Sequence, residues 1–142
     1  MQPLSNNYLI DLAGQLAFLS AFLGGFSATF LVTLLVADSS KRITNWVVGS
    51  TAISACCFIV AVISFVMISS VLHPGTPSNV YSEEGINTAR VVSILGFSFG
   101  ILMLLASVAM SGWIRSKKVG ICTSCISFIA IVLVFWAITG FK

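Results

Sequence analysis

Charged residues are scarce in this sequence. Of its 142 residues, 7 are Lys or Arg and 4 are Asp or Glu, so charge makes up 8% of the chain, whereas 58% is hydrophobic. A soluble domain carries roughly 25% charged residues, so this chain has too little polar surface to remain in water. Its length suits one domain. We therefore expect a single membrane domain over 1–142, with no separate soluble module.

The sequence has a single histidine, and its long apolar segments carry no carboxylate near their middle. The single histidine, His73, has no second histidine to complete a haem or His-based metal site. Ionisable groups are costly in lipid and usually mark transport sites, yet none lies near the middle of an apolar run. Asp11 and Arg90 lie near run ends, where a pair between them would fix the first helix to the third. The alternative is that each side chain reaches the lipid headgroups separately. This lack of a central carboxylate argues against proton-coupled antiport and against the small multidrug exporters, which need a glutamate in their first helix.

The four cysteines form an adjacent pair, Cys56-Cys57, and a CxxC pair, Cys122 and Cys125. A reducing cytoplasm opposes a disulfide at the second pair, and hydrocarbon surroundings oppose the thiolates that zinc requires. We expect buried, inert thiols, with no metal and no cofactor. A cluster of Cys56 with Cys125 is the alternative, because both can lie at similar depth.

Four long apolar runs occupy most of the chain, at 12–37, 46–72, 88–113 and 119–140. Each exceeds the 18 or so residues that cross a bilayer. Continuous apolar runs favour helices over the alternating pattern of barrel strands. The start of the chain has no basic segment, and its first run is too long for a signal peptide, so we expect that span to be permanent. The predicted fold class is an all-α integral membrane protein, a bundle of four transmembrane helices.

The orientation follows from the short loops. Loops 38–45 and 114–118 carry most of the basic residues, whereas the loop between the second and third helices carries Glu83 and Glu84. Lys and Arg favour the cytoplasmic side, so we expect both termini outside and those two loops in the cytoplasm, in a multipass protein of a bacterial inner membrane. The basic set is Lys41, Arg42, Arg115, Lys117 and Lys118. Topology alone explains it; the alternative is a site for an anionic ligand, such as lipid headgroups, a nucleotide or a nucleic acid.

Small residues recur every three or four positions in all four runs. Small residues let membrane helices approach closely, so these seams predict a compact left-handed bundle. The seams either hold one protomer together or face another subunit. The first helix is the better candidate for a subunit contact, because Gly24 and Gly25 are adjacent and widen its small face. The residues assigned to packing or to an oligomer interface are Gly14, Ala21, Gly24, Gly25, Ala28, Gly96 and Gly100.

Polar residues in the first helix suggest a pore lining. Asp11 and Gln15 would form polar rings at an outer mouth, Thr29 and Thr33 lie further along, and apolar residues between them would gate by dewetting. A phenylalanine stripe with i, i+4 spacing begins at Phe18 and faces lipid or a partner. The alternative for Gln15 is a hydrogen bond between helices.

The overall build, four membrane helices with short loops and a basic cytoplasmic side, resembles the small multipass effectors of bacterial antiphage defence. This resemblance of architecture covers the whole chain. It implies a homo-oligomeric channel or pore, opened by an anionic signal at the basic loops. The alternative is a non-catalytic assembly subunit of a larger membrane complex, with another membrane protein as partner. No residue constellation specifies an enzyme, so we expect none.

Overall fold

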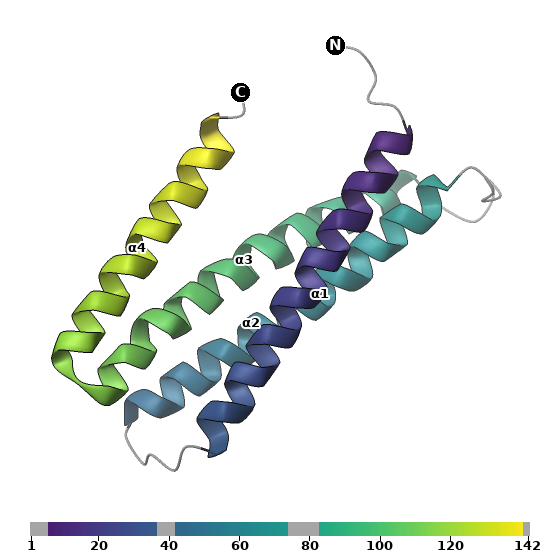
Figure 1. Ribbon diagram of the computed structural model, residues 1–142. Helices are drawn as coiled ribbons and strands as arrows, with labels where there is room; N and C mark the ends of the chain where they lie inside the picture. Colours follow the sequence, from purple (N-terminus) through teal and green to yellow (C-terminus); the bar gives the residue numbers. More distant parts are fainter. Residues whose placement is uncertain (1–5, 37–41, 74–82, 141–142) are drawn as a thin grey trace.

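The computed structural model describes residues 6–36, 42–73 and 83–140, and over these residues the chain is helical except at His73 and Ser116 (Figure 1). The helices are α1 (Asn6–Val36), α2 (Arg42–Leu72), α3 (Glu83–Arg115) and α4 (Lys117–Gly140). All four are long and apolar enough to cross a membrane. The expectation of four apolar helices is therefore confirmed, and they suggest a multipass membrane protein.

The helices begin earlier than the apolar runs do. They start at residues 6, 42, 83 and 117, where the runs predict starts at 12, 46, 88 and 119. Apolar composition marks the part of a helix that lipid covers, whereas backbone hydrogen bonding continues through polar residues beside it. Polar first turns such as Thr44-Asn45 are therefore part of the helix, and the expected boundaries were too short at the N-terminal ends.

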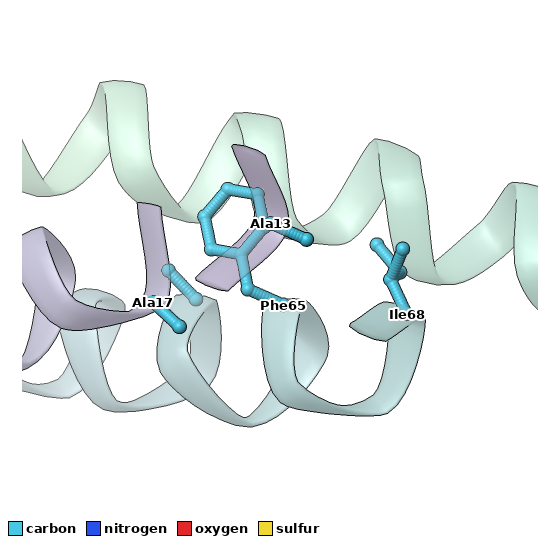
Figure 2. Close-up of a cluster of buried hydrophobic side chains, with 5 residues drawn as sticks. Ala13, Ala17, Phe65 and Ile68 are labelled. Atoms are coloured by element: carbon cyan, nitrogen blue, oxygen red, sulfur yellow. The ribbon is translucent and has the colours of Figure 1, made fainter. Parts of the chain in front are cut away.

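Helix α2 lies between α1 and α3 and packs against both along its length. Towards the end of α2, the side chains of Phe65 and Ile68 pack against Ala13 and Ala17 of α1 (Figure 2). Phe97 of α3 meets the ring of Phe65 edge-on, with ring centres 6.4 Å apart. We refer to these three helices as the three-helix unit.

The tight turn between α3 and α4 brings two glycines against the opposite helix. A Cβ added to Gly112 would collide with the Thr123 hydroxyl, and one added to Gly120 would collide with the indole of Trp113. The Thr123 hydroxyl lies 3.1 Å from the carbonyl oxygen of Ala109 in α3 and equally near those of Val119 and Gly120 in its own helix, so its one proton is shared among them. Trp113 Nε1 donates to Ser124 Oγ at 3.2 Å. These contacts anchor the start of α4 on the end of α3.

Beyond this anchor, α4 diverges from the three-helix unit (Figure 1). Among the described residues, the packing of α4 is on α3, so the structure differs from the expected compact bundle of four helices. The reason is side-chain size. Glycines allow close approach at the turn, whereas Ile101, Leu105 and Ile131 further away line an apolar cleft of about 440 Å³ between the two helices.

Candidate functional site

The two faces of α1 differ in what they contact. One face is buried and carries Ala13, Ala17, Ser20 and Ser27, and Gly24 lies on it in contact with Phe58 of α2. The opposite face is exposed. Within the three-helix unit, neighbouring helices cover one side of α1 only. Its exposed side can therefore meet lipid, water or another chain, and we examine it as the candidate site.

Phe58 fills the junction of the three helices. Its side chain is fully buried. A Cβ added to Gly24 would lie 3.3 Å from Phe58 Cβ, and one added to Gly100 would lie 3.0 Å from the Phe58 ring. The glycines of α1 and α3 thus form the space for this ring. Gly96 serves a related purpose, because its added Cβ would lie 3.3 Å from the carbonyl oxygen of Cys57.

Two serines connect the three helices beside this ring. Ser54 Oγ of α2 donates to the carbonyl oxygen of Gly100 in α3 at 2.9 Å. Ser27 Oγ of α1 lies 3.4 Å from Ser54 Oγ and donates to the carbonyl of Leu23 at 2.9 Å. Both serines are fully buried. The middle of the three-helix unit is therefore solid, with each of these buried hydroxyls hydrogen-bonded.

All four residues proposed to line a pore lie on the exposed face of α1. Asp11, Gln15, Thr29 and Thr33 are exposed. At 3.6 residues per turn, Asp11 and Thr29 share one direction, and Gln15 and Thr33 share another about 40° away. Asp11 and Thr33 are about 33 Å apart along the helix axis at 1.5 Å per residue, close to the thickness of a hydrocarbon core of about 30 Å. We call this set the polar face of α1.

The middle of the polar face is aromatic. Phe18 and Phe22 point in nearly the same direction as the polar residues, and their side chains are 75% and 66% exposed. These values show that the chain itself does not cover them. The face is therefore polar at both ends and apolar in between.

The polar residues at the two ends differ in their hydrogen bonds. Thr29 Oγ1 donates to the carbonyl of Gly25, and Thr33 Oγ1 to the carbonyl of Thr29, both at 2.9 Å. At the other end, no described residue pairs with the side chains of Gln15 or Asp11. Arg90 lines a different hollow from Asp11, and of the two interpretations for these residues the Asp11–Arg90 pair is not formed.

Small residues on α1 fall into two groups. Gly14, Ala21, Gly25 and Ala28 are exposed, and a Cβ added to Gly14 or Gly25 would meet nothing within 4 Å. These four residues form a stripe beside the polar face and do not pack within the chain. The seam that does pack against α2 uses Ala13, Ala17, Ser20, Gly24 and Ser27. We call the exposed group the small stripe of α1.

The structure describes part of the basic set. Lys117 and Lys118 are exposed at the start of α4. Arg42 and Arg115 lie at helix ends, and their side chains, like the whole of Lys41, lie outside the described residues. The turn between α3 and α4 thus carries two exposed lysines, Lys117 and Lys118. A shared anion-binding surface formed by all five residues of the basic set stays a prediction.

The cysteines are less buried by the chain than expected. Cys56, Cys122 and Cys125 are exposed on the helix surfaces, and Cys57 is partly buried. The described residues contain no group of three or more His, Cys, Asp or Glu side chains arranged to hold a metal ion. The chain itself thus leaves three of the four thiols uncovered, because these positions face away from the neighbouring helices, and the expectation that the thiols are inert stays a prediction.

Phe58 is the residue that the sequence interpretation missed. Nothing in its immediate sequence separates it from the other phenylalanines, yet its i−4 neighbour Ser54 lies on the small-residue seam of α2, which was a usable signal.

Comparisons of the chain with protein-family models, with curated proteins and with solved structures find no match. The candidate site is therefore defined by the chain's own geometry, and it is the exposed polar face of α1 with the small stripe beside it.

Proposed function

We propose that the chain is a homo-oligomeric membrane channel or pore-forming effector in which α1 lines the water path. The observation that carries this proposal is the position of Asp11, Gln15, Thr29 and Thr33 on the exposed side of α1, within about 40° of one another around the helix. A helix whose exposed face met lipid alone would gain nothing from these residues.

The cost of exposing polar groups to lipid supports the proposal. An amide or hydroxyl moved into an apolar medium without a hydrogen bond loses roughly 2–7 kcal/mol, and a carboxylate loses more. Gln15 has no described partner and lies about one turn further into the span than Asp11, so its amide in a membrane requires water or another chain. A pore at the centre of several copies supplies both.

One copy is too small to enclose a path. Phe58, Ser27 and Ser54 fill the middle of the three-helix unit, so water would pass between copies. The small stripe of α1 lies beside the polar face and suits this assembly, because Gly14, Gly25 and their neighbours allow the backbone of an adjacent copy to approach closely.

The aromatic middle of the polar face suggests how such a pore closes. Asp11 and Gln15 would hold water at one mouth, and Thr29 and Thr33 at the other. A ring of Phe18 and Phe22 side chains between them would form an apolar constriction, and narrow apolar constrictions exclude water and stop conduction. Rotation of α1 that moves these rings aside would open the path.

The cytoplasmic side is the proposed place of control. With both termini outside, Lys117 and Lys118 face the cytoplasm with the other basic loop residues and attract an anionic activator, either a nucleotide or a nucleic acid. In this arrangement the protein resembles the small multipass effectors of bacterial antiphage defence, acts in a bacterial inner membrane, and has no catalytic role.

The direct test is ion conduction by purified protein in planar lipid bilayers, with the number of copies counted by native mass spectrometry. We expect a defined oligomer with discrete conductance steps. Gln15→Leu should change the unitary conductance, whereas Cys125→Leu, at an exposed position on α4, should not. Unchanged conductance in Gln15→Leu together with reduced stability would reject the pore lining.

The control by anions has a separate test. The double replacement Lys117→Gln and Lys118→Gln should weaken activation by an added oligonucleotide or nucleotide without changing the open-channel conductance. Because these side chains are exposed, the replacement should not affect folding. An unaltered response to the activator would discard the sensing role.

The alternative function is a non-catalytic assembly subunit of a larger membrane complex. The observation that favours it is the amount of uncovered apolar surface on α4, where Ile126, Phe128 and Trp136 are exposed. In that case the small stripe of α1 and the open side of α4 would bind different chains. A protein that is monomeric and non-conducting by itself, but stable when co-produced with a neighbour, would support this alternative over the channel.

A further inference from the structure

A hollow of about 200 Å³ lies among α1, α2 and α3 at the end of the three-helix unit that contains the start of α1. Its walls are almost entirely apolar and include Leu12 and Leu16 of α1 and Phe65 and Leu72 of α2. Arg90 of α3 also lines it and is its one charged residue. The hollow thus has an apolar interior, with one cationic residue among those that line it.

No described acidic group neutralises Arg90. Asp11 lines a separate hollow with Gln15 and Ser69. Glu84 is six residues earlier on α3, which places it about 120° around the helix from Arg90. Arg90 is exposed as a residue and makes no ion pair with any described residue, so it is available to an anion from outside the chain.

The rest of the hollow offers an anion little else. The nearby Ser93 hydroxyl is buried and donates to the backbone carbonyl of Arg90 at 2.9 Å, so it is already occupied. A ligand that fits must therefore have a compact anionic group for one guanidinium and an apolar part for the leucine and phenylalanine walls. The planar guanidinium binds phosphate oxygens through two parallel hydrogen bonds.

We propose that this hollow binds one anionic phospholipid of the bilayer, with its phosphate on Arg90 and part of an acyl chain against Leu12, Leu16 and Phe65. The acyl chain leaves surroundings as apolar as those it enters, so its burial adds little to affinity. Selectivity for an anionic headgroup then comes from Arg90. The lipid would connect α1 with α3 at the position where a salt bridge between them is missing.

The experiment is native mass spectrometry of the delipidated full-length protein with equimolar phosphatidylglycerol and phosphatidylcholine. We expect wild type to retain one phosphatidylglycerol in preference to phosphatidylcholine by about tenfold, as one charge-assisted contact provides. Arg90→Gln should abolish the preference. Lys117→Gln, which removes an exposed cation at the opposite end of α3, is the matched control and should retain it.

Two further measurements define the ligand. Leu12→Trp places a large side chain at a position that is 39% exposed, so the protein should fold, and it should lose the bound lipid because the hollow is narrowed. Circular dichroism checks that Leu12→Trp folds. If it does not fold, the lipid preference of Arg90→Gln alone tests whether the hollow binds the lipid. Glycerol 3-phosphate should not displace the lipid, and oleate should compete weakly.

Three results would overturn the proposal. One is an equal phosphatidylglycerol preference in wild type and Arg90→Gln, and a second is loss of the preference in Lys117→Gln, which would move the lipid to the basic turn. The third is displacement by glycerol 3-phosphate at concentrations equal to those of the lipid, which would make this an anion site without a role for the hollow. The site is independent of channel activity, so failure of either proposal leaves the other standing.

Discussion

The three-helix unit and α4 contain similar proportions of small residues, yet the first is packed along its length and the second is held at one end. In the three-helix unit, small residues on two helices face the same large ring, as Gly24 and Gly100 do with Phe58. In α4, Gly120 faces the end of α3, but bulky side chains such as Ile131 face the rest of it. Close packing therefore depends on which residues oppose one another across the interface, and the number of small residues in a helix is a poor guide to it.

The largest effect is expected where the three helices meet. Gly100→Leu puts a branched side chain where a single added carbon would already lie 3.0 Å from the Phe58 ring. We expect the free energy of unfolding to fall by about 3 kcal/mol, the upper part of the range for overpacked cores. The measurement is steric trapping in lipid nanodiscs. Gly25→Leu is the control, because nothing lies near Gly25 within the chain, and a comparable loss there would contradict the account.

Removing the Phe58 ring should lower the free energy of unfolding by somewhat less than Gly100→Leu does. Phe58→Ala leaves a cavity among three helices, and in lipid the transfer contribution is small because the surroundings are also apolar. We expect a loss of about 2 kcal/mol by the same method. Phe22→Ala removes the same side chain from an exposed position of α1 and should change the stability of the monomer very little; equal losses for the two would mean that burial in the junction does not matter.

The serine link between α2 and α3 should contribute less again. Ser54→Ala removes the hydrogen bond to the carbonyl of Gly100, which retains its own bond within the helix. Hydrogen bonds between membrane helices contribute about 0.6–1.7 kcal/mol, so we expect a loss of about 1 kcal/mol. Thr29→Val provides the comparison, since its hydroxyl bonds within its own helix. A loss of less than about 0.3 kcal/mol in Ser54→Ala would mean that the hydrogen bond from Ser54 to Gly100 does not stabilise the packing of α2 against α3.

The smallest effect is expected on the free part of α4. Leu133 is exposed, so Leu133→Ala should change the free energy of unfolding by less than about 0.5 kcal/mol, as is usual for surface positions. A loss of 2 kcal/mol or more would mean that α4 packs against another protein chain in the membrane. The difference in packing between α4 and the three-helix unit would then apply to a single copy but not to the assembled protein.

The helices themselves were predictable from the sequence, because apolar length is set by the thickness of the bilayer. The packing face of α1 was harder to predict. The sequence interpretation assigned Gly14, Ala21 and Ala28 to packing or to an oligomer interface. Packing within the chain uses Ala13, Ser20 and Ser27 instead, so the oligomer interface stays a prediction for the first set. Both sets have helical spacing and small side chains, so spacing cannot choose between them. The choice depends on Phe58 and Ser54 of α2, which lie more than 25 residues away in the chain.

The divergence of α4 had no usable signal in its own sequence. Gly120, Thr123 and Ser127 have the spacing of a packing seam, and Gly120 and Ser127 are buried, as such a seam suggests. Whether the seam continues depends on the residues of α3 opposite it. Where the seam would continue, Ile101 and Leu105 of α3 and Ile131 of α4 line a cleft instead, which only the pairing of the two helices reveals. By contrast, the shared direction of Asp11, Gln15, Thr29 and Thr33 follows from their sequence spacing alone.

The most direct test of the central claim is the accessibility of single cysteines along α1 to a water-soluble thiol reagent. The four native cysteines are replaced by serine or alanine, and one cysteine at a time is introduced from position 11 to position 33 in protein reconstituted into liposomes. The account predicts fast modification at positions 11, 15, 29 and 33, slower modification at 18 and 22, and none at the buried positions 13 and 17. Uniform protection of positions 15 and 29, together with absent conductance, would show that this face meets lipid or another protein and would contradict a water path along α1.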